Sequence, residues 1–177
     1  THLLDRYALH RSDQDEQPVE AELGQGELRS NLVFRLGEAW FGLATRSLVE
    51  VAPQTLIHSL PHQRSIGLLG VTNVRGALVA CLSLSELLGL EPGAAPVSER
   101  RVVPRMLILA GQGGPVVAPV DEVDGIHGIP LALVNEAGKG TAQVAKRFAT
   151  GVLQWRGRSI TLLDEEMLQQ AIVRSLG

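Results

Sequence analysis

The sequence predicts a mainly β protein made of two similar lobes, and three observations lead to this prediction. Short segments that alternate between apolar and polar residues are separated by Gly or Pro at close intervals, which is typical of small barrels. Several of these segments recur in the same order in the second half of the chain. The clearest helical pattern covers only the last part, from Asp164 to Arg174.

The composition fits a globular protein and excludes one class of partner. The chain has 177 residues, enough for one compact domain or for two small ones that share a core. Its formal net charge of -3 leaves no basic surplus to neutralise phosphates. Its six aromatic residues, three Phe, two Trp and one Tyr, are too few for base-stacking platforms. We therefore expect no nucleic-acid partner.

The single cysteine and the lengths of the apolar runs indicate where the protein works. Cys81 lies within the apolar run 77–82, where a thiol usually packs as a small hydrophobic residue. One cysteine cannot form an internal disulfide, which fits a reducing cytoplasm. No apolar run approaches the roughly 18–20 residues that a membrane span needs. We expect a soluble, cytoplasmic protein without direct membrane insertion.

Residues 1–30 form a polar, charge-dense leader that precedes the predicted domain. A weak apolar set within it predicts a short amphipathic helix, and the charged residues after this set predict a flexible linker. The apolar set consists of Leu3, Leu4, Tyr7 and Leu9.

The first predicted lobe covers about residues 31–90. Apolar residues alternate over 31–36, and a turn at 37–39 leads into a second strand over 40–44, so these segments predict a hairpin. Further strands are expected at 47–51, 69–74 and 77–84.

A short helix is predicted to follow the last of these strands. Ser83 and Glu86 have the spacing of a capping box, in which the hydroxyl accepts a backbone hydrogen bond and Glu86 reaches back to Ser83. Gly89 is suited to end the helix. The Pro and Gly residues that come next predict a connector over about 91–101.

The second predicted lobe, about residues 102–174, repeats features of the first. The pattern G-V-x-x-x-R-G occurs at Gly70–Gly76 and again, 81 positions later, at Gly151–Gly157. An apolar strand follows each copy and leads to a helix-capping residue, Ser83 or Asp164, again 81 positions apart. Because the matches keep their order, they predict two lobes of similar β architecture. The other matches pair Gly37 with Gly111 and Val49–Val51 with Asp121–Val123.

The titratable residues do not suggest an active site or a metal centre. His58 and His62 have the spacing of a helical metal pair, but Pro61 between them disfavours the helix that this spacing needs. His127 lies alone in a predicted Gly-rich turn. Gly138–Thr141 lacks the upstream glycine and the residue order of a phosphate loop. We therefore expect no catalytic residue, no metal and no cofactor.

Five polar residues interrupt otherwise apolar segments and are candidates for a binding role. Two interpretations of Glu50 remain open: its alternation with two valines places it in solvent, or it pairs with Arg75 beside an apolar groove. Such a partly exposed pair stabilises a protein by only about 0–1 kcal/mol, so its value would be to orient a partner. The five residues are Glu50, Asn73, Arg75, Asp121 and Arg156.

The order of several motifs resembles that of the CheW family of chemotaxis coupling proteins. Together the matching segments span about residues 30–174, although each piece alone is short. In the first half they are Phe34–Gly37, Phe41–Leu43, Val49–Val51 and Leu69–Gly76. In the second half they are Val120–Val123, Thr150–Val152 and Leu162–Asp164.

This resemblance implies a fold and a function for residues 31–174. The implied fold is two SH3-like five-stranded barrels packed together, with short helices and a C-terminal helix. The implied function is a non-enzymatic adaptor, recruited to receptor arrays at the inner membrane, that bridges methyl-accepting chemoreceptor tips and the regulatory domain of a CheA-type histidine kinase. The implied receptor-binding groove comprises Leu48, Glu50, Val51, Asn73 and Arg75. The implied kinase-binding surface comprises Val79, Ala80, Leu82 and Ser83.

Two positions depart from the family pattern, which commonly has Pro and Asp where this chain has Ala80 and Ser83. Ser83 is still suited to cap a helix, whereas Ala80 removes a rigid residue from the predicted partner-binding edge. Together with the apolar run 79–82 and the charged leader, these changes suggest an adaptor of a surface-sensing or other alternative pathway. Two other interpretations stay open: a detached regulatory domain of a histidine kinase, and a small metal-dependent β-barrel enzyme.

Overall fold

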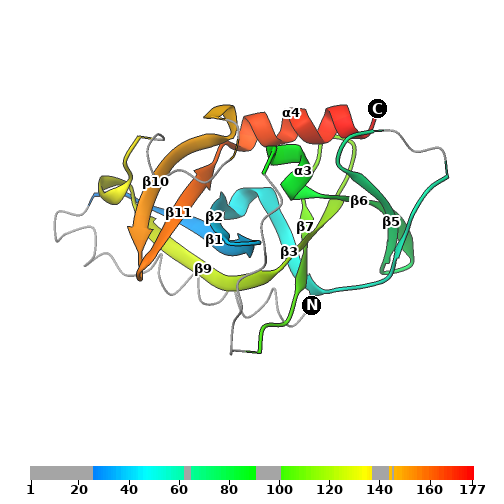
Figure 1. The fold of residues 1–177 in the computed structure, drawn as a ribbon, viewed down its shortest axis with the longest axis horizontal. Coiled ribbons are helices and arrows are strands. Elements are labelled where there is room, and N and C mark those ends of the chain that lie inside the picture. Colours follow the sequence, from blue (N-terminus) through cyan, green and yellow to red (C-terminus); the bar gives the residue numbers. More distant parts are fainter. Residues whose placement is uncertain (1–25, 62–64, 91–100, 137–143, 145) are drawn as a thin grey trace.

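Two β-sheets make up most of the computed structural model, which describes residues 26–61, 65–90, 101–136, 144 and 146–177. Helix α4 (Glu165–Ser175) runs across the top of the molecule with α3 (Leu84–Leu88) beneath it (Figure 1). The protein is therefore mainly β with a C-terminal helix, as the sequence predicts. No helix in these ranges is both long and apolar enough to cross a membrane.

The first sheet has five strands and the second has six. The first sheet, in spatial order, consists of β10 (Ala149–Trp155), β11 (Arg158–Leu163), β2 (Ala39–Ala44), β1 (Leu28–Leu36) and β9 (Glu122–Pro130). The second sheet consists of β3 (Leu48–Pro53), β7 (Arg105–Leu109), β8 (Val116–Val120), β6 (Ala77–Leu82), β5 (Leu68–Val74) and β4 (Ile57–His58). The described part of the chain also contains the single-turn 3-10 helices η2 (Thr45–Ser47), η3 (Leu131–Leu133) and η4 (Lys146–Phe148).

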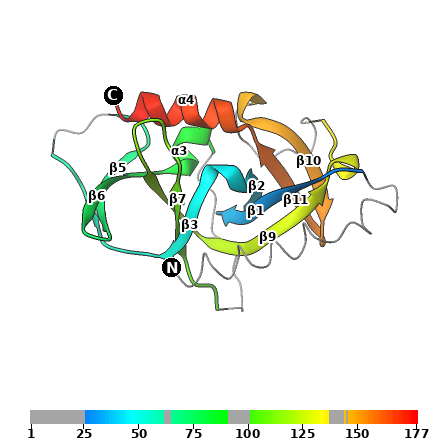
Figure 2. The same ribbon diagram turned by 180° about the vertical axis from the view of Figure 1, so that it is seen from behind.

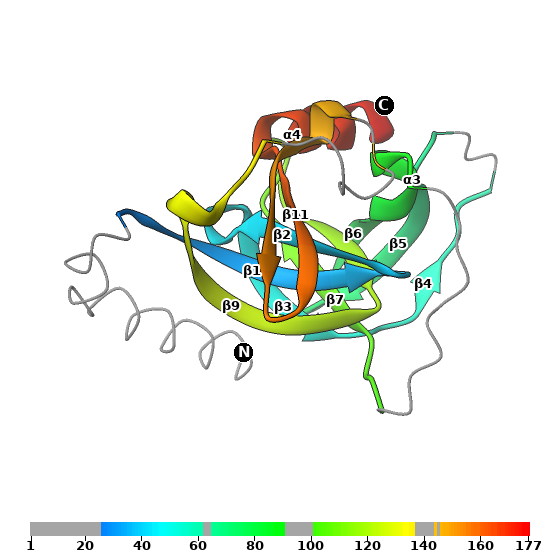
Figure 3. The ribbon, with the colours of Figure 1, turned by 60° about the vertical axis from the view of Figure 1, so that its left-hand side comes forward.

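The repeated sequence pattern corresponds to two hairpins of the same construction. β5 pairs with β6, and β10 pairs with β11, and each pair has a register shift at the equivalent glycine, Gly70 or Gly151. Each hairpin then leads to a helix, α3 or α4. Figure 3 shows the β10–β11 hairpin in front, with β4, β5 and β6 on the other side of the molecule. The duplication predicted from the sequence is confirmed by these matching elements.

Each sheet takes strands from both halves of the sequence. The β1–β2 hairpin joins the strands of the second half, through antiparallel pairing of β1 with β9 and parallel pairing of β2 with β11. The β7–β8 hairpin likewise joins the strands of the first half. The chain crosses between the sheets at η2, which leads into β3 (Figure 2). The spatial lobes therefore do not follow the predicted ranges 31–90 and 102–174, because the two halves exchange their first hairpins.

The sheets also differ from two equal five-stranded barrels. The short strand β4 adds a sixth strand to the second sheet. Among the described residues, strand pairing leaves both sheets open, since β10 and β9 end one and β3 and β4 end the other.

Three apolar cores hold the sheets and helices together. The largest lies between the sheets and under both helices, and its bulkiest members are Phe34, Phe41 and Phe148. Because β1 is buried on both faces, its residue Val33 enters a second core instead. The second core, on the first sheet, contains Val33, Ile129, Leu153, Ile160 and Leu162. The third, on the second sheet, contains Cys81, Met106, Ile108 and Val117.

The residue before each helix caps it as predicted. Oγ of Ser83 accepts a hydrogen bond from the backbone N–H of Glu86 at 3.3 Å, and the left-handed Gly89 (φ 69°) ends α3. The other half of the predicted capping box is wrong. The carboxylate of Glu86 accepts from the N–H of Gly67 at 3.0 Å, because the N–H of Ser83 already donates to the carbonyl of Gly67.

The turn predicted around His127 is wrong, because this residue lies in a long strand. His127 lies within β9, where it is only 8% exposed, and not in a turn. Two nearby glycines suggest a turn, but pairing with β1 along most of its length keeps β9 extended. His58 lies on β4, and His62 lies outside the described residues. Residues 1–25, most of the connector and Gly138–Thr141 also lie outside them.

Candidate functional site

Glu50 and Arg75 form an ion pair on the second sheet. Nη2 of Arg75 lies 2.5 Å from Oε1 of Glu50. Glu50 is 1% exposed, whereas the side chain of Arg75 is 60% exposed. The predicted pair is therefore confirmed, and the interpretation that Glu50 faces solvent is wrong. A register shift between Leu48 and Glu50 turns the intervening Val49 outward, where it is 41% exposed.

The β5–β6 turn holds Arg75 in place. Arg75 and Gly76 are its two central residues, and both have positive φ, 51° and 87°, which suits a two-residue hairpin. Oδ1 of Asn73 accepts a hydrogen bond from the N–H of Gly76 at 2.9 Å and stabilises the turn. Since β3 and β5 lie near opposite ends of the second sheet, the Glu50–Arg75 pair shows that this sheet curls upon itself.

The residues predicted for receptor binding differ in accessibility. Asn73 and Arg75 are exposed on the turn. Leu48 is half-buried and packs against the central core, and Val51 is completely buried in it. Val51 can therefore only support this surface from beneath. Val49, which the sequence prediction omitted, is the exposed apolar side chain of β3, and its 41% exposure distinguishes it from its neighbours.

The residues predicted for kinase binding also divide into buried and accessible ones. Leu82 is 1% exposed and belongs to the central core, and Ser83 caps α3. Val79 is half-buried and packs against the core of the second sheet. Ala80 remains partly accessible on β6.

Two exposed leucines, one on β6 and one just before β4, were missed by sequence reasoning. Leu78 lies opposite Asn73 in the β5–β6 register and is 70% exposed. Leu56, 74% exposed, comes just before β4, and its carbonyl accepts a hydrogen bond from Oγ1 of Thr72 at 2.8 Å. The alternation along β6 was the available signal, because it places Leu78 and the half-buried Val79 on opposite faces of the strand.

The first sheet carries a different set of ion pairs. Nε of Arg35 lies 3.0 Å from Oε1 of Glu122, and both side chains are 12% exposed. Asp124 accepts hydrogen bonds at both oxygens, from Nη1 of Arg158 at 2.9 Å and from Nε2 of His127 at 2.7 Å. Burial alone would raise the pKa of Asp124, but these two partners outweigh it and hold the pKa below its usual value.

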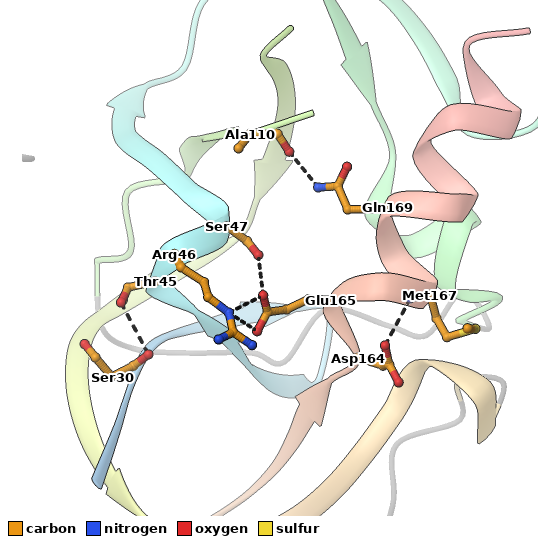
Figure 4. Close-up of polar contacts among 9 residues, drawn as sticks. All are labelled: Ser30, Thr45, Arg46, Ser47, Ala110, Asp164, Glu165, Met167 and Gln169. Carbon is orange, nitrogen blue, oxygen red and sulfur yellow. Dashed lines mark hydrogen bonds and ion pairs between the residues drawn. The ribbon is translucent and has the colours of Figure 1, made fainter. Parts of the chain in front are cut away.

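A cluster of polar contacts ties the crossover η2 to α4 (Figure 4). Nε of Arg46 donates to both carboxylate oxygens of Glu165, at 2.9 and 2.7 Å, and Oγ of Ser47 donates to the same carboxylate at 3.2 Å. Further along α4, Nε2 of Gln169 donates to the carbonyl of Ala110 at 2.6 Å. The helix is thus fixed to the segment that leads directly into β3 and Glu50. The partners are 118 or 119 positions apart in the cluster around Glu165, so no local sequence signal could have found them.

A cleft of about 800 Å³ opens beside this cluster. Its apolar lining comes from the first sheet, at Ile129 and Leu162, and its polar lining includes Arg29, Arg46 and three carboxylates, those of Asp164, Glu165 and Glu166. The carboxylate of Glu165 is already paired with Arg46, so at Glu165 the cleft offers positioning contacts and no free acid–base pair.

Two further observations concern candidate metal ligands and the single cysteine. No group of three or more His, Cys, Asp or Glu residues in the described ranges could hold a metal ion. Cys81 is fully buried, and this burial raises the pKa of its thiol to about 11, so the thiol stays protonated at neutral pH.

The chain is similar to known proteins both in sequence and in structure. The profile described as the CheW-like domain matches residues 30–172. A probable chemotaxis protein CheW from Rhizobium etli is 30% identical over 147 residues, which cover 82% of this chain and 90% of that protein. The crystal structure of the scaffolding protein TtCheW from Thermoanaerobacter tengcongensis is similar with a TM-score of 0.61 and 20% identity, covering 80% of this chain and 92% of that one.

Proposed function

This chain belongs to the CheW family, whose members are non-enzymatic adaptors that couple chemoreceptors to a CheA-type kinase, and we propose which of its surfaces meet each partner. The chain is accordingly a scaffold of a chemosensory complex. The proposed partners are the cytoplasmic tip of a methyl-accepting chemoreceptor and the regulatory domain of the kinase. The proposed adaptor unit is residues 31–174, working in the cytoplasm at receptor arrays of the inner membrane.

The Glu50–Arg75 pair carries the proposal for the receptor surface. The buried carboxylate holds one end of the exposed guanidinium, so Arg75 is presented in a defined position beside Asn73. An oriented cation of this kind contributes to specificity and register more than to affinity. Val49 supplies an adjacent exposed apolar side chain on β3, while Leu48 and Val51 shape this strand from the core side.

The outer face of β5 and β6 supports the proposal for the kinase surface. Leu78 and Leu56 are among the most exposed large apolar residues of the described chain, and exposed apolar patches on soluble proteins usually mark interaction sites. Ala80 lies on the same strand as Leu78, two positions along, and therefore on the same face. Val79, Leu82 and Ser83 would act indirectly, by fixing β6 and α3 under this face.

A pull-down with a receptor signalling fragment and with the kinase regulatory domain tests both assignments. We expect Arg75→Glu to weaken receptor binding at least tenfold and Leu78→Glu to weaken kinase binding at least tenfold. Arg156→Glu is the matched control for the first variant, because Arg156 occupies the same turn position in the other hairpin. Leu133→Glu, at a residue 52% exposed on η3, is the control for the second. Receptor and kinase binding by Arg75→Glu at the parent's level would refute the receptor surface.

The apolar run 79–82 and the charged leader carry a finer proposal, that the adaptor serves a surface-sensing or other alternative pathway. A deletion strain tests this directly. We expect the strain to lose its response to surfaces and to keep swimming chemotaxis, and loss of swimming chemotaxis would contradict the proposal.

A further inference from the structure

A second groove lies where α3, α4 and η4 meet, away from the Glu50–Arg75 pair. Its volume is about 400 Å³. Its floor is apolar and well packed, since Leu88 and Phe148 are at most 1% exposed and Ala171 is 5% exposed. Apolar floors of this kind become binding sites when the rim supplies exposed anchors and charge.

Ile66 forms one lip of this groove and is 76% exposed. The backbone around it is clamped from both helices. Oγ of Ser175 on α4 donates to the carbonyl of Ile66 at 2.7 Å, and the N–H of Gly67 donates to Oε2 of Glu86 on α3 at 3.0 Å. An added Cβ at Gly67 would lie 2.6 Å from Cδ2 of Leu87, so this segment fits closely against α3. The fold therefore holds a large apolar side chain outward on a fixed support.

The charge of the rim is positive. Arg147 and Arg174 both line the groove and are exposed. The ion pairs within the described ranges use other cations, so neither arginine has a carboxylate partner there. The carboxylate of Glu86, which also lines the groove, already accepts the hydrogen bond from Gly67. The cations that form the ion pairs are Arg35, Arg46, Arg75, His127 and Arg158.

Local roles account for the two arginines but not for Ile66. The guanidinium carbon of Arg147 lies 4.6 Å from the centroid of the Phe148 ring, and Arg174 lies in the last turn of α4, where the helix dipole favours a cation. Neither role requires an exposed isoleucine in the same groove. An apolar anchor next to two cations is complementary to a surface that has aliphatic side chains flanked by carboxylates.

We propose that this groove docks an acidic amphipathic helix of a protein partner, whose aliphatic side chains pack on the exposed Ile66 while its carboxylates pair with Arg147 and Arg174. Such helix-in-groove recognition uses one apolar face of the helix and leaves its charged residues at the rim. The inference does not depend on the receptor or kinase surfaces proposed above, because it uses none of their residues.

Two designed peptides test the proposal with the full chain. The probe is a fluorescein-labelled helical peptide with leucines on one face and glutamates beside them, and its twin has lysines in place of the glutamates. In fluorescence anisotropy we expect the glutamate peptide to bind at least tenfold more tightly than the lysine peptide. Arg147→Glu/Arg174→Glu should reverse this preference, and Ile66→Ser should weaken binding of the glutamate peptide at least fivefold.

The controls separate docking from general electrostatics. Arg29→Glu/Arg156→Glu changes the net charge equally at two exposed arginines outside the groove, and it should leave both affinities within twofold. Circular dichroism checks that each variant is folded, which the exposure of the three groove residues favours. Equal binding of the two peptides, no binding of the glutamate peptide, or an equal loss in the control variant would overturn the proposal. Concentration-dependent dimers that Arg147→Glu/Arg174→Glu abolishes would assign the groove to a second copy and overturn it too.

Discussion

The β5–β6 and β10–β11 hairpins have the same backbone and use it for different interactions. Both turns consist of Arg followed by Gly, and φ of the arginine is 51° in each. In the second sheet, Arg75 pairs with the buried Glu50. In the first sheet, the guanidinium carbon of Arg156 lies 5.5 Å from the Trp155 ring centroid, and Glu122, the counterpart of Glu50, pairs with Arg35 on β1.

This difference shows that the two copies share backbone features but not the partners of their side chains. The turns, the bulges at Gly70 and Gly151 and the helix caps are properties of the backbone, and both copies keep them. The partner of the turn arginine is a property of side chains, and it differs. Among the described residues, the second sheet is the one that links its turn arginine to a buried carboxylate, on β3 near the opposite end of the sheet, and for this reason we place the proposed receptor surface there.

Substituting the bulge glycines should give the largest difference in stability loss between the two hairpins. Gly70 has φ 148°, and an added Cβ would overlap the backbone carbonyl of His58, which cannot move without breaking the β4–β5 pairing. At Gly151 the overlap is mainly with the side chain of Val134. We expect Gly70→Ala to lower the free energy of unfolding by about 3–5 kcal/mol, and Gly151→Ala by about 1–3 kcal/mol.

Urea unfolding followed by circular dichroism measures both changes. Gly113→Ala is the control, because an added Cβ there meets no atom within 4 Å. A larger loss for Gly151→Ala than for Gly70→Ala would show that the two bulges are not under the constraints described here.

Substituting the turn arginines should give the next largest difference in stability loss between the two hairpins. Arg75→Ala removes the ion pair that the exposed guanidinium makes with the buried Glu50 carboxylate, which we expect to cost about 1–3 kcal/mol of unfolding free energy. Arg156→Ala removes an exposed contact with Trp155 and should cost about 1 kcal/mol or less. A double-mutant cycle with Glu50→Gln checks the cause, since Glu50→Gln should recover part of the loss in Arg75→Ala. Equal losses for the two arginines would remove the distinction between the hairpins.

The hairpins could be predicted from the sequence because the residues that form them are close together in the chain. The pairing of strands that are far apart in the chain could not be predicted. The Arg–Gly turns and the caps Ser83 and Asp164 lie within a few residues of what they stabilise. Period-two alternation indicates that a strand exists but not which strand it pairs with, so the exchange of the first hairpins was not foreseen.

The ion pairs follow the same rule. Glu50 and Arg75 belong to the same half of the sequence, and their pairing could be proposed although β3 and β5 are not neighbours in the sheet. The pairs of Arg35, Arg46 and Arg158 join residues 34 to 119 positions apart, and folding alone brings them together. Likewise alternation places Leu78 and Val79 on opposite faces, but only the packing of the half-buried Val79 on the core of the second sheet shows which of the two faces is the outer one.

Substituting the helix caps should give a smaller difference in stability loss, and here the second copy should lose more than the first. Asp164 caps the eleven-residue α4 through a 3.0 Å hydrogen bond, and Ser83 caps the five-residue α3 through one of 3.3 Å. We expect Asp164→Ala to cost about 1–2 kcal/mol and Ser83→Ala about 0.5–1 kcal/mol of unfolding free energy. Thermal unfolding measures both. Asp164→Asn keeps an acceptor at the cap and should cost less than Asp164→Ala, and the reverse order would argue against the capping role.

Asp124 should give the smallest difference in unfolding free energy, and this difference should change with pH only in acid. Its counterpart in the repeat, 72 positions earlier, is Ala52, so only the first sheet has a titratable group here. Because Arg158 and His127 hold the pKa of Asp124 below its unfolded value of about 3.9, its stabilisation is complete above that pH and is lost as the pH falls through the lowered pKa. The difference in unfolding free energy between the parent and Asp124→Asn should therefore be constant above about pH 5 and shrink below about pH 4. Ala52→Ser introduces no titratable group, so its difference from the parent should stay flat over the same range. A difference for Asp124→Asn that is also flat down to pH 2 would mean that Arg158 and His127 do not stabilise the carboxylate in the folded protein.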